Sequence, residues 1–509
     1  MLKILWIIVI LVVGVLLTAL ITYKSLPENV GRKESIRLPV NPEGNMAKHL
    51  VREVTAHKGE SGLYPLAGGR DAFAARLALA ENAQYSIDVQ YYIWHDDVSG
   101  RLLMQSLKKA ADRGVRVRML LDDNTMAGMD GLLAALNSHP NIEVRLFNPF
   151  MQRGFRPLGF LSDFFRLNRR MHNKSFTADS VVSIVGGRNI GDEYFDVGSG
   201  VLFADLDVAA VGKAAEDVSE DFDRYWADMA AYPLETITGK IQEADLDTVP
   251  SGDPVTQAYL KTLAESDFAG HLRGGNLPLV WAKTQLISDD PAKVHNKALA
   301  KDTVMAKIAP IMAGAEKELL IVSPYFVPGK RGTALLNGVA EKGGNVAVLT
   351  NSLAANDVAV VHSGYAKYRK DLLKGGVALY ELKADATVRP KSNHFLGSSS
   401  GASLHAKTFS VDGQYLFVGS FNMDPRSAIL NTEMGLMVDN EELAAQLGKG
   451  LKAGKHQYTY MVEAGDKGGL QWRTGENGRE VVYNDEPHST WVQRATVWVA
   501  SKLPIEWLL

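Results

Sequence analysis

The chain has 509 residues, of which 46% are hydrophobic and 22% charged, and its formal net charge is −3. This composition is that of an ordinary folded protein and excludes a wholly disordered chain or a fibrous repeat. The near-neutral charge argues against a dedicated nucleic-acid-binding protein, which carries a marked basic excess. Because the sequence has no cysteine, disulfides, iron–sulfur clusters, thiolate zinc sites and cysteine nucleophiles are excluded.

The first predicted element is an apolar segment near the N-terminus. Residues 4–23 carry no charge, and Lys3 and Lys24 flank them. About 20 apolar residues match the hydrocarbon thickness of a bilayer. A cleaved signal peptide has a shorter apolar region, of about 7–15 residues, followed by small residues. We therefore expect a transmembrane anchor over residues 1–24, and the basic residues on its two sides leave the orientation undecided.

The segment after this anchor, residues 25–58, is polar and contains three prolines, so it is expected to be a tether. The body that follows is predicted to contain one strand–helix–strand unit twice, because apolar residues alternate in the strands and recur with helical spacing between them. The unit is expected over residues 85–93, 102–113 and 115–121 in the first copy and over residues 319–327, 333–342 and 346–349 in the second. Units of this length imply parallel strands flanked by helices.

Equivalent residues in the two copies are separated by nearly the same interval. Tyr91 and Tyr325 are 234 positions apart, and His172 and His405 are 233 apart. An internal duplication explains this agreement. We predict an α/β fold of two duplicated halves with mainly parallel or mixed sheets, related by a pseudo-twofold axis, with an active site at their interface. The expected boundaries are 59–245 for the first half, 246–295 for a connector, 296–445 for the second half and 446–509 for a C-terminal extension.

Each half contains the pattern H-x-K-x-x-x-x-D, formed by His172, Lys174 and Asp179 in the first half and by His405, Lys407 and Asp412 in the second. On a strand, a His and a Lys two positions apart point to the same face. Two halves packed face to face would therefore bring two imidazoles and two ammonium groups into one cleft. There the lysines would neutralise a phosphodiester, one imidazole would attack phosphorus, and the other would protonate the leaving oxygen. A single copy is more often structural, but two matching copies favour catalysis.

A turn follows each pattern at the same distance. It reads Gly186-Gly187-Arg-Asn189 in the first half and Gly419-Ser420-Phe-Asn422 in the second. Small residues allow backbone N–H groups to approach a phosphate, and asparagine side chains add donors. The predicted substrate-binding residues are Gly187, Asn189, Ser420 and Asn422.

A carboxylate on the second ring nitrogen would fix the tautomer of each catalytic imidazole. Glu433 lies 28 residues after His405, and Asp207 lies on the corresponding predicted strand of the first half. We therefore expect Asp207 to pair with His172 and Glu433 to pair with His405. The alternative for each acid is an ordinary position facing solvent.

The paired pattern resembles the phospholipase D superfamily. Four further segments, residues 168–174, 185–191, 365–371 and 503–509, resemble the bacterial cardiolipin synthases of the C type. The resemblance extends from about residue 60 to the last residue. It implies two displacement steps, in which His172 forms a phosphatidyl–histidine intermediate and His405 acts first as acid and then as base. It also implies that Asp179 and Asp412 orient the site and that no metal or other cofactor takes part.

The resemblance implies phosphatidylethanolamine as the donor and phosphatidylglycerol as the acceptor, and the apolar N-terminal segment predicts the bacterial inner membrane as the location. Motif symmetry does not decide which histidine attacks, and the need for an accessory protein stays open. One alternative is a hydrolase of the same superfamily, a phospholipase D or a nuclease, in which water replaces the lipid hydroxyl. Another is a membrane-tethered binding protein without activity, which two intact motifs argue against.

Two surfaces are expected to contact lipid. Residues 151–174 combine six basic residues with many Phe and Leu residues and lead directly to His172. Such a basic, aromatic segment is typical of insertion at an anionic membrane, although a core-packing helix would give a similar pattern. The C-terminal segment contains Trp491, Trp498 and Trp507, and tryptophan is typical of the membrane interface. Docking of this segment onto the body of the protein would explain the same residues equally well. The adjacent residues His95, Asp96 and Asp97 are discounted as a metal site.

Overall fold

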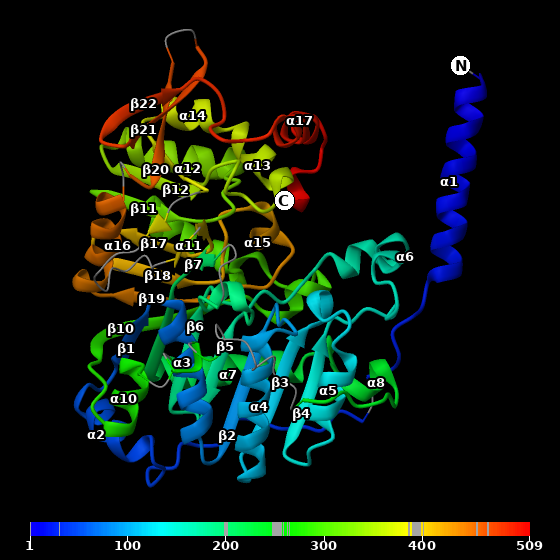
Figure 1. Cartoon of the computed structure of the whole chain (residues 1–509), viewed down its shortest axis with the longest axis vertical. Coiled ribbons are helices and arrows are strands. Elements are labelled where there is room, and N and C mark those ends of the chain that lie inside the picture. The colour runs from blue at the N-terminus through cyan, green and yellow to red at the C-terminus, as the bar shows by residue number, and fades with distance from the viewer. Residues whose placement is uncertain are drawn as a thin grey trace.

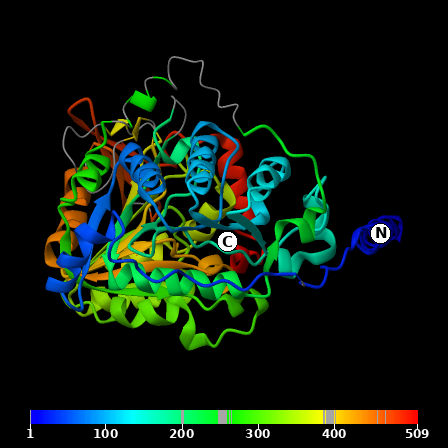
Figure 2. The ribbon, with the colours of Figure 1, turned by 90° about the horizontal axis from the view of Figure 1, so that it is seen from below.

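The computed structural model describes residues 2–29, 31–197, 202–246, 257, 259–261, 263, 265–384, 387–388, 399–400, 402–454, 457–465 and 468–509. Two α/β halves stack on each other, the first from blue to green and the second from green to red in Figure 1. The C-terminus lies on the second half, and the N-terminal helix stands to one side of the body (Figures 1 and 2).

The apolar N-terminal segment forms helix α1 (Leu2–Thr22), as its composition predicts. Within the part of the chain that the structure describes, no helix combines the length and apolarity that crossing a bilayer requires. The transmembrane span expected over residues 1–24 is therefore not found there. Helix α1 contacts α6 of the first half, and at its C-terminal end the Thr22 carbonyl accepts from the Gln152 side chain.

The segment predicted as a tether lies along the surface of the first half. Arg118 Nη1 donates to the Ser35 carbonyl at 2.9 Å, and Arg116 Nη1 donates to the Ile36 carbonyl at 2.8 Å. The segment then forms helix α2 (Ala47–Ala56), whose Leu50 is buried in the core of the first half. Sequence composition indicated a loose connection, but arginines from the body fix its backbone carbonyls.

The sheet of the first half has the strand order β9–β4–β3–β2–β5–β6–β8–β1. The neighbours among β2, β3 and β4 are parallel and the other pairs are antiparallel. The strands are β1 (Ser61–Leu66), β2 (Ser86–Tyr91), β3 (Arg116–Asp122), β4 (Ile142–Phe147), β5 (Ser175–Ala178), β6 (Val182–Gly186), β8 (Asp207–Gly212) and β9 (Ala231–Pro233). Side chains alternate along β2, so that Ile87 and Val89 enter the apolar core while Asp88 on the other face binds Arg118.

The sheet of the second half repeats this order as β20–β13–β12–β11–β17–β18–β19–β10, with β21 and β22 added beyond β20. Its strands are β10 (Val280–Ser288), β11 (Glu318–Val322), β12 (Asn345–Asn351), β13 (Ala378–Leu382), β17 (Lys407–Val411), β18 (Tyr415–Gly419), β19 (Met434–Asp439), β20 (Thr459–Ala464), β21 (Leu470–Glu476) and β22 (Arg479–Tyr483). Strands β1 and β10 pair antiparallel and join the two sheets. The prediction of duplicated halves with mixed sheets is confirmed.

Four strands of the second sheet lie outside the range 296–445 expected for that half, namely β10, β20, β21 and β22. Strand β10 falls in the predicted connector and pairs with β19, and β20 falls in the predicted C-terminal extension and pairs with β13. Both are held by partners distant in sequence, which a local pattern does not reveal. Residues 247–256 of the predicted connector lie outside the described residues.

Helices cover the faces of both sheets (Figure 1). They are α3 (Gly69–Asn82), α4 (Val98–Asp112), α5 (Asp130–Asn137), α6 (Pro157–Leu167), α7 (Lys213–Ala227), α8 (Leu234–Thr238) and α10 (Asp267–Gly274) in the first half and α11 (Val304–Ala313), α12 (Gly329–Glu341), α13 (Ala359–Ala366), α14 (Arg369–Lys374), α15 (Pro425–Ile429), α16 (Glu441–Gly454) and α17 (Trp491–Ala500) in the second. Helix α4 shows the local signals clearly: the Asp97 side chain caps it by accepting from the Gly100 N–H at 2.9 Å, and Gly114 with φ +95° follows its end.

One buried apolar cluster draws residues from both halves. Leu206 and Val208 of the first half belong to it together with Val418 and Leu436 of the second. Burial of apolar surface contributes roughly 25 cal/mol per Å², so this shared core favours the association of the two halves. Leu404 and Ala406, the neighbours of His405 in sequence, also belong to it.

Candidate active site

Each motif histidine lies on a segment that is hydrogen-bonded to the opposite half. In the second half, β16 (Ala402–Leu404) pairs in parallel with β7 (Leu202–Ala204) of the first. The next residue, His405, donates its backbone N–H to the Ala204 carbonyl at 2.8 Å. The Asn351 side chain fixes the same segment by accepting from the Leu404 N–H at 2.9 Å.

The first-half histidine is held in the same crossed manner. Met171 forms a parallel bridge with Thr432 of the second half. His172 donates its backbone N–H to the Thr432 carbonyl at 2.9 Å, and the Thr432 N–H donates to the Arg170 carbonyl at 2.9 Å. The interface between the halves therefore positions both histidines.

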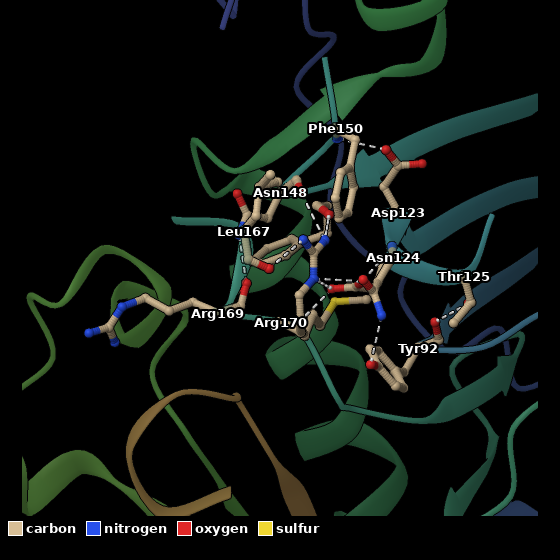
Figure 3. Close-up of polar contacts among 12 residues, drawn as sticks. Tyr92, Asp123, Asn124, Thr125, Asn148, Phe150, Leu167, Arg169 and Arg170 are labelled. Atoms are coloured by element: carbon tan, nitrogen blue, oxygen red, sulfur yellow. Dashed lines mark hydrogen bonds and ion pairs between the residues drawn. The ribbon is translucent and has the colours of Figure 1, made fainter. Parts of the chain in front are cut away.

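Arg170, at the centre of Figure 3, anchors the chain just before His172. Its Nε donates to Asp122 Oδ1 at 2.9 Å, and its Nη2 donates to the Asn148 carbonyl at 2.8 Å. Asp122 Oδ2 accepts from the Met171 N–H at 2.8 Å. Since both side chains of this ion pair are fully buried, they fix the approach to His172 without solvent screening.

The two imidazoles pair with carboxylates from the opposite half. His172 Nδ1 lies 2.8 Å from Glu433 Oε2, and His405 Nδ1 lies 2.5 Å from Asp205 Oδ2. The predicted pairs Asp207–His172 and Glu433–His405 are therefore wrong. The physical reason is the crossed pairing of the motif segments, which turns each ring toward the neighbouring half.

The sequence analysis did not identify Asp205, but the register of two strand pairs shows that it is equivalent to Glu433. Gly186 is opposite Asp207 in the β6–β8 pair, and Gly419 is opposite Gly435 in the β18–β19 pair. Counting back two residues from these partners leads to Asp205 and Glu433, which are thus equivalent. A sequence signal could have located Asp205. When the two segments are aligned, Leu206 and Val208 match Met434 and Leu436, and Asp205 then matches Glu433.

Asp207 instead belongs to a separate buried ion pair with Arg76. Its Oδ2 accepts from Arg76 Nη2 at 2.8 Å, and its Oδ1 accepts from the Arg188 N–H at 3.2 Å. Arg76 Nε also donates to the Tyr91 hydroxyl at 2.8 Å. Residues two positions apart point to the same face only within a regular strand. Strand β8 begins at Asp207, so Asp205 lies before the strand and its side chain does not have to follow that of Asp207.

The two lysines reach back over their own histidines. Lys174 Nζ donates to the His172 carbonyl at 2.6 Å, and Lys407 Nζ lies 3.1 Å from His405 Nε2. Burial lowers the pKa of Lys174 well below its usual value and that of Lys407 to about 8. The carboxylates of Glu433 and Asp205 oppose this shift for both lysines. Burial thus disfavours the charged form of both lysines, and an anionic substrate would stabilise that form.

Both imidazoles are kept neutral in the absence of an anion. Burial, followed by the charges of Lys174 and Lys407, lowers the pKa of His172 well below its usual value. Burial and Lys407 lower the pKa of His405 to about 4, although Asp205 opposes the shift. Since both lysines act on both rings, the four motif side chains form one electrostatic cluster.

The two carboxylates differ in charge. Burial raises the pKa of Glu433 to about 7. Burial also opposes ionisation of Asp205, but the His405 ring and the Lys407 ammonium group outweigh it and hold the pKa of Asp205 well below its usual value. Asp205 therefore carries its negative charge more firmly than Glu433 does.

The motif aspartates lie at turns and bind backbone. Asp179 accepts from the N–H groups of Gln84, Tyr85 and Ser86. Asp412 accepts equivalently from the N–H groups of residues 316, 317 and 318. Both have left-handed φ values, 54° and 56°, that aspartate tolerates in turns. Their contacts fit the orienting role that the resemblance implies.

The four residues predicted to bind substrate occupy different settings. The Asn189 side chain binds within the protein, where Oδ1 accepts from the Ile93 N–H and Nδ2 donates one N–H to the Tyr194 hydroxyl, and its role in substrate binding stays a prediction. Asn422 Oδ1 is buried and has no hydrogen-bond partner in the described part of the chain. Its predicted role in substrate binding stays a prediction.

The glycine and serine of the two turns face the carboxylates. A Cβ atom on Gly187 would lie 2.2 Å from Asp205 Oδ1, so the position has no space for a side chain. At the equivalent position Ser420 donates its hydroxyl to Glu433 Oε2 at 2.5 Å. The Gly187 N–H bonds to the Leu206 carbonyl rather than pointing to a phosphate site. This correction follows from strand pairing, which uses the backbone donors.

Aromatic rings that the sequence analysis did not single out pack on the imidazoles. The Tyr92 ring meets the His172 ring edge to face, with centroids 4.9 Å apart. The Phe203 ring stacks on the His405 ring at 5.1 Å, and Tyr194 meets it edge to face at 5.1 Å. Asn124 Nδ2 fixes Tyr92 by donating to its hydroxyl, as Figure 3 shows. These ring contacts restrict the orientation of both imidazoles.

Ligand atoms of His95, Asp97 and Glu193 lie within 4.8 Å of one another. His95, Asp96 and Asp97 were discounted as a metal site because adjacent residues diverge, and here Glu193 takes the third position. His95 Nδ1 is 3.2 Å from Glu193 Oε1, and Asp97 caps α4.

Comparisons with known proteins follow the same division of the chain. A family profile described as "Cardiolipin synthase, PLD-like domain" matches residues 77–226 and 308–453, one match in each half. Cardiolipin synthase C of Escherichia coli K12 is 50% identical over 473 residues, which cover 91% of this chain and 99% of that protein. The chain belongs to the cardiolipin synthase family of phospholipase D-like proteins. The family resemblance predicted from the sequence, and with it the prediction of an enzyme, is confirmed.

More distant relatives show how widely the fold is shared. Cardiolipin synthase A of Pseudomonas syringae is 26% identical over 391 residues, covering 76% of this chain and 67% of that one. The crystal structure of a phosphatidylserine synthase from Haemophilus influenzae matches with a TM-score of 0.55 and 16% identity, covering 81% of this chain and 91% of that one. At this identity the structural match supports the fold alone.

Proposed function

We propose that this member of the cardiolipin synthase family transfers a phosphatidyl group from phosphatidylethanolamine to phosphatidylglycerol and so makes cardiolipin. The observation that carries the proposal is the crossed pairing of His172 with Glu433 and of His405 with Asp205 around two buried lysines. The 50% identity to cardiolipin synthase C over nearly its whole length supports the same reaction.

In the first step His172 is the nucleophile. With Nδ1 2.8 Å from Glu433, its Nδ1–H donates to that carboxyl and its Nε2 keeps a free electron pair. Nε2 attacks phosphorus and forms a P–N bond while the P–O bond to ethanolamine breaks. Lys174 and Lys407 hold the phosphoryl oxygens as charge develops on them.

His405 supplies the proton for the leaving oxygen. The arriving phosphodiester carries negative charge that offsets the two lysines, so the pKa of His405 rises from about 4 when substrate binds. The ionised Asp205 stabilises the resulting imidazolium from Nδ1. The proton passes to the ethanolamine oxygen and leaves His405 neutral.

In the second step neutral His405 acts as base. It takes the proton from a glycerol hydroxyl of phosphatidylglycerol, whose oxygen attacks phosphorus while the P–N bond to His172 breaks. Cardiolipin leaves, His172 is again neutral, and His405 again carries a proton. No metal enters these steps because the lysines supply the positive charge.

A carboxylate near the site supports an ammonium-bearing donor. The Tyr325 hydroxyl donates to both oxygens of Asp357 at 2.9 Å, and the charge of Asp357 acts on the Lys407 ammonium group. Together with the rings of Tyr92 and Tyr194, this carboxylate offers the surroundings in which proteins bind ammonium groups. Asp357→Asn should raise KM for phosphatidylethanolamine several-fold, and an unchanged KM would remove Asp357 from the head-group site.

The enzyme is proposed to act at the bacterial inner membrane, attached through the apolar N-terminal segment. Large apolar side chains of α1 are exposed, among them Trp6 at 61%, Leu20 at 77% and Ile21 at 80%. Replacing Leu20 and Ile21 with Asp should shift the protein from the membrane fraction toward the soluble fraction. If the double variant stays bound to membranes, attachment does not depend on this end of α1.

The reaction is tested with purified full-length protein in mixed micelles of phosphatidylethanolamine and phosphatidylglycerol. Cardiolipin and free ethanolamine in equal amounts are the expected products. Phosphatidic acid without cardiolipin would overturn the transferase and favour a hydrolase of the same superfamily. Omission of phosphatidylglycerol is the matched control and should stop cardiolipin formation.

A further inference from the structure

A large cavity lies in the second half, outside the catalytic cluster. It has a volume of about 1100 Å³ and lies between α11, α12, α15 and the C-terminal turn η5 (Glu506–Leu508). Ligand pockets are typically about 300–1000 Å³, so this cavity exceeds the space that a small polar metabolite needs. Its apolar lining includes Met305, Ala309, Met312, Phe326, Leu335 and Ile429. An apolar cavity of this size suits a hydrocarbon chain.

The mouth of the cavity is cationic. Lys330 and Arg331 line it from the first turn of α12, are exposed, and form no ion pair within the described part of the chain. The free N–H groups of that first turn add positive potential, since no side chain caps α12. Arg169, which Figure 3 shows pointing away from the cluster around Arg170, lines the cavity from the first half.

The two acidic residues of the lining do not offset this charge. Glu506 already binds Lys367 Nζ at 3.3 Å and the Tyr368 hydroxyl at 2.8 Å. Asp424 caps α15 by accepting from the Ser427 N–H at 2.7 Å, and burial raises its pKa to about 7. The mouth therefore attracts an anion.

An exposed aromatic surface leads to the mouth. Trp507 lines the cavity and is 42% exposed, and its ring lies 6.5 Å from that of Phe164 on α6. The neighbouring Phe165 is 77% exposed. Helix α6 in turn contacts α1, the apolar N-terminal helix. A lipid leaving a membrane beside α1 would meet this surface before the cavity.

The cavity wall is connected to the catalytic cluster. Lys293, which lines the cavity, donates to Asp289 Oδ2 at 2.9 Å, and the same oxygen accepts from the Glu433 N–H at 2.8 Å. Glu433 is the partner of His172, and Arg169 precedes His172 by three residues. A lipid in the cavity would thus lie against the same segments that form the active site.

We propose that this cavity binds an acyl chain of an anionic phospholipid whose phosphate contacts Lys330 and Arg331. The identity of the lipid, phosphatidylglycerol, rests on the proposed function. The apolar volume selects the chain, and the cations at the mouth select an anionic head group over a zwitterionic one. The site recruits the acceptor lipid to the second half of the enzyme.

The test is photolabelling of full-length His172→Ala protein, in which no turnover consumes the lipid. Phosphatidylglycerol with a diazirine in one acyl chain is added in mixed micelles, and labelled peptides are identified by mass spectrometry. We expect labelling in residues 303–312 and 329–336, competition by unlabelled phosphatidylglycerol, and at least tenfold weaker competition by phosphatidylethanolamine. Labelling confined to other peptides would overturn the proposal.

Cavity-filling variants decide whether the lipid lies inside. Ala309→Phe, or Ala428→Phe where the first variant does not fold, should reduce this labelling at least fivefold. Ala334→Phe is the matched control, because Ala334 is exposed on α12 and does not line the cavity. Equal labelling in the filled and control variants would overturn the proposal.

Charge reversal tests the mouth. Lys330→Glu combined with Arg331→Glu should abolish the preference for phosphatidylglycerol, whereas Lys342→Glu, at the far end of α12, should leave it unchanged. An unchanged preference in the double variant would overturn the assignment of the phosphate. If the wild-type protein makes cardiolipin but the cavity is not labelled, only the inference about the cavity is refuted. If the cavity is labelled but no cardiolipin forms, only the proposed reaction is refuted.

Discussion

The two halves share one fold, but the carboxylates that pair with their two imidazoles differ in charge. His172 is paired with Glu433, whose pKa is raised to about 7 and whose Oε2 also accepts the Ser420 hydroxyl. His405 is paired with Asp205, whose carboxylate stays ionised, and Gly187 leaves the space for it. A firmly ionised partner stabilises an imidazolium, whereas a more neutral partner orients a neutral ring. This difference supports the proposed roles, acid–base catalysis by His405 and nucleophilic attack by His172, between which motif symmetry does not choose.

Removal of each histidine in turn is expected to have the largest effect and tests which of the two attacks phosphorus. His172→Ala should lower kcat by about 10⁴-fold or more, because no P–N bond can form. With a phosphatidyl donor whose leaving group needs no proton, such as a nitrophenol, His405→Ala should still release one leaving group per active site in a rapid burst. A burst in the His172 variant and none in the His405 variant would reverse the assignment.

Removing the carboxylate charges should give a smaller, unequal effect. Asp205→Asn should lower kcat by about 10³-fold, because the imidazolium of His405 loses its counter-charge. Glu433→Gln should cost about 10²-fold, since an amide still fixes the ring. Both are measured as kcat for cardiolipin formation, with circular dichroism to verify folding. Equal losses would show that the two pairs work alike.

The pH dependence of kcat/KM tests the role of the lysine charges. Lys407, with a pKa of about 8 instead of 10.5, is charged below this pH and neutral above it. We expect kcat/KM, which reports the free enzyme, to fall about tenfold per unit as pH rises above about 8. Glu433→Gln should keep a decrease and move it to lower pH, because the Glu433 charge raises the pKa of Lys407, whereas titration of Glu433 itself would be lost in this variant. A plateau up to pH 10 would contradict the lowered pKa.

The smallest expected effect concerns the motif aspartates and is one of stability. Asp179 is 5% exposed, whereas Asp412 is partly open to solvent, and each accepts three backbone N–H groups. Hydrogen bonds to charged groups contribute about 1.5–3 kcal/mol when buried. Asp179→Ala should therefore lower Tm by several degrees more than Asp412→Ala in a thermal melt. A larger shift for Asp412 would contradict this ranking.

Much of this protein can be predicted from local sequence. The duplicated strand–helix–strand units follow from apolar periodicity, and the motif residues His172, Lys174, His405 and Lys407 follow from their repeated spacing. The structure places these four side chains in one buried cluster. Strands β10 and β20 could not be assigned to the second half in this way, because their partners are distant in sequence.

The duplication, the two motifs and the family follow from residue types at fixed spacing, so local sequence is enough to predict them. Only the tertiary structure decided which carboxylate meets which imidazole. The Thr432 and Ala204 carbonyls bind the backbone N–H groups of His172 and His405 across the interface, so Glu433 and Asp205 reach the rings of the opposite half. Such pairing depends on hydrogen bonds between segments more than 200 residues apart, and no local pattern carries that information.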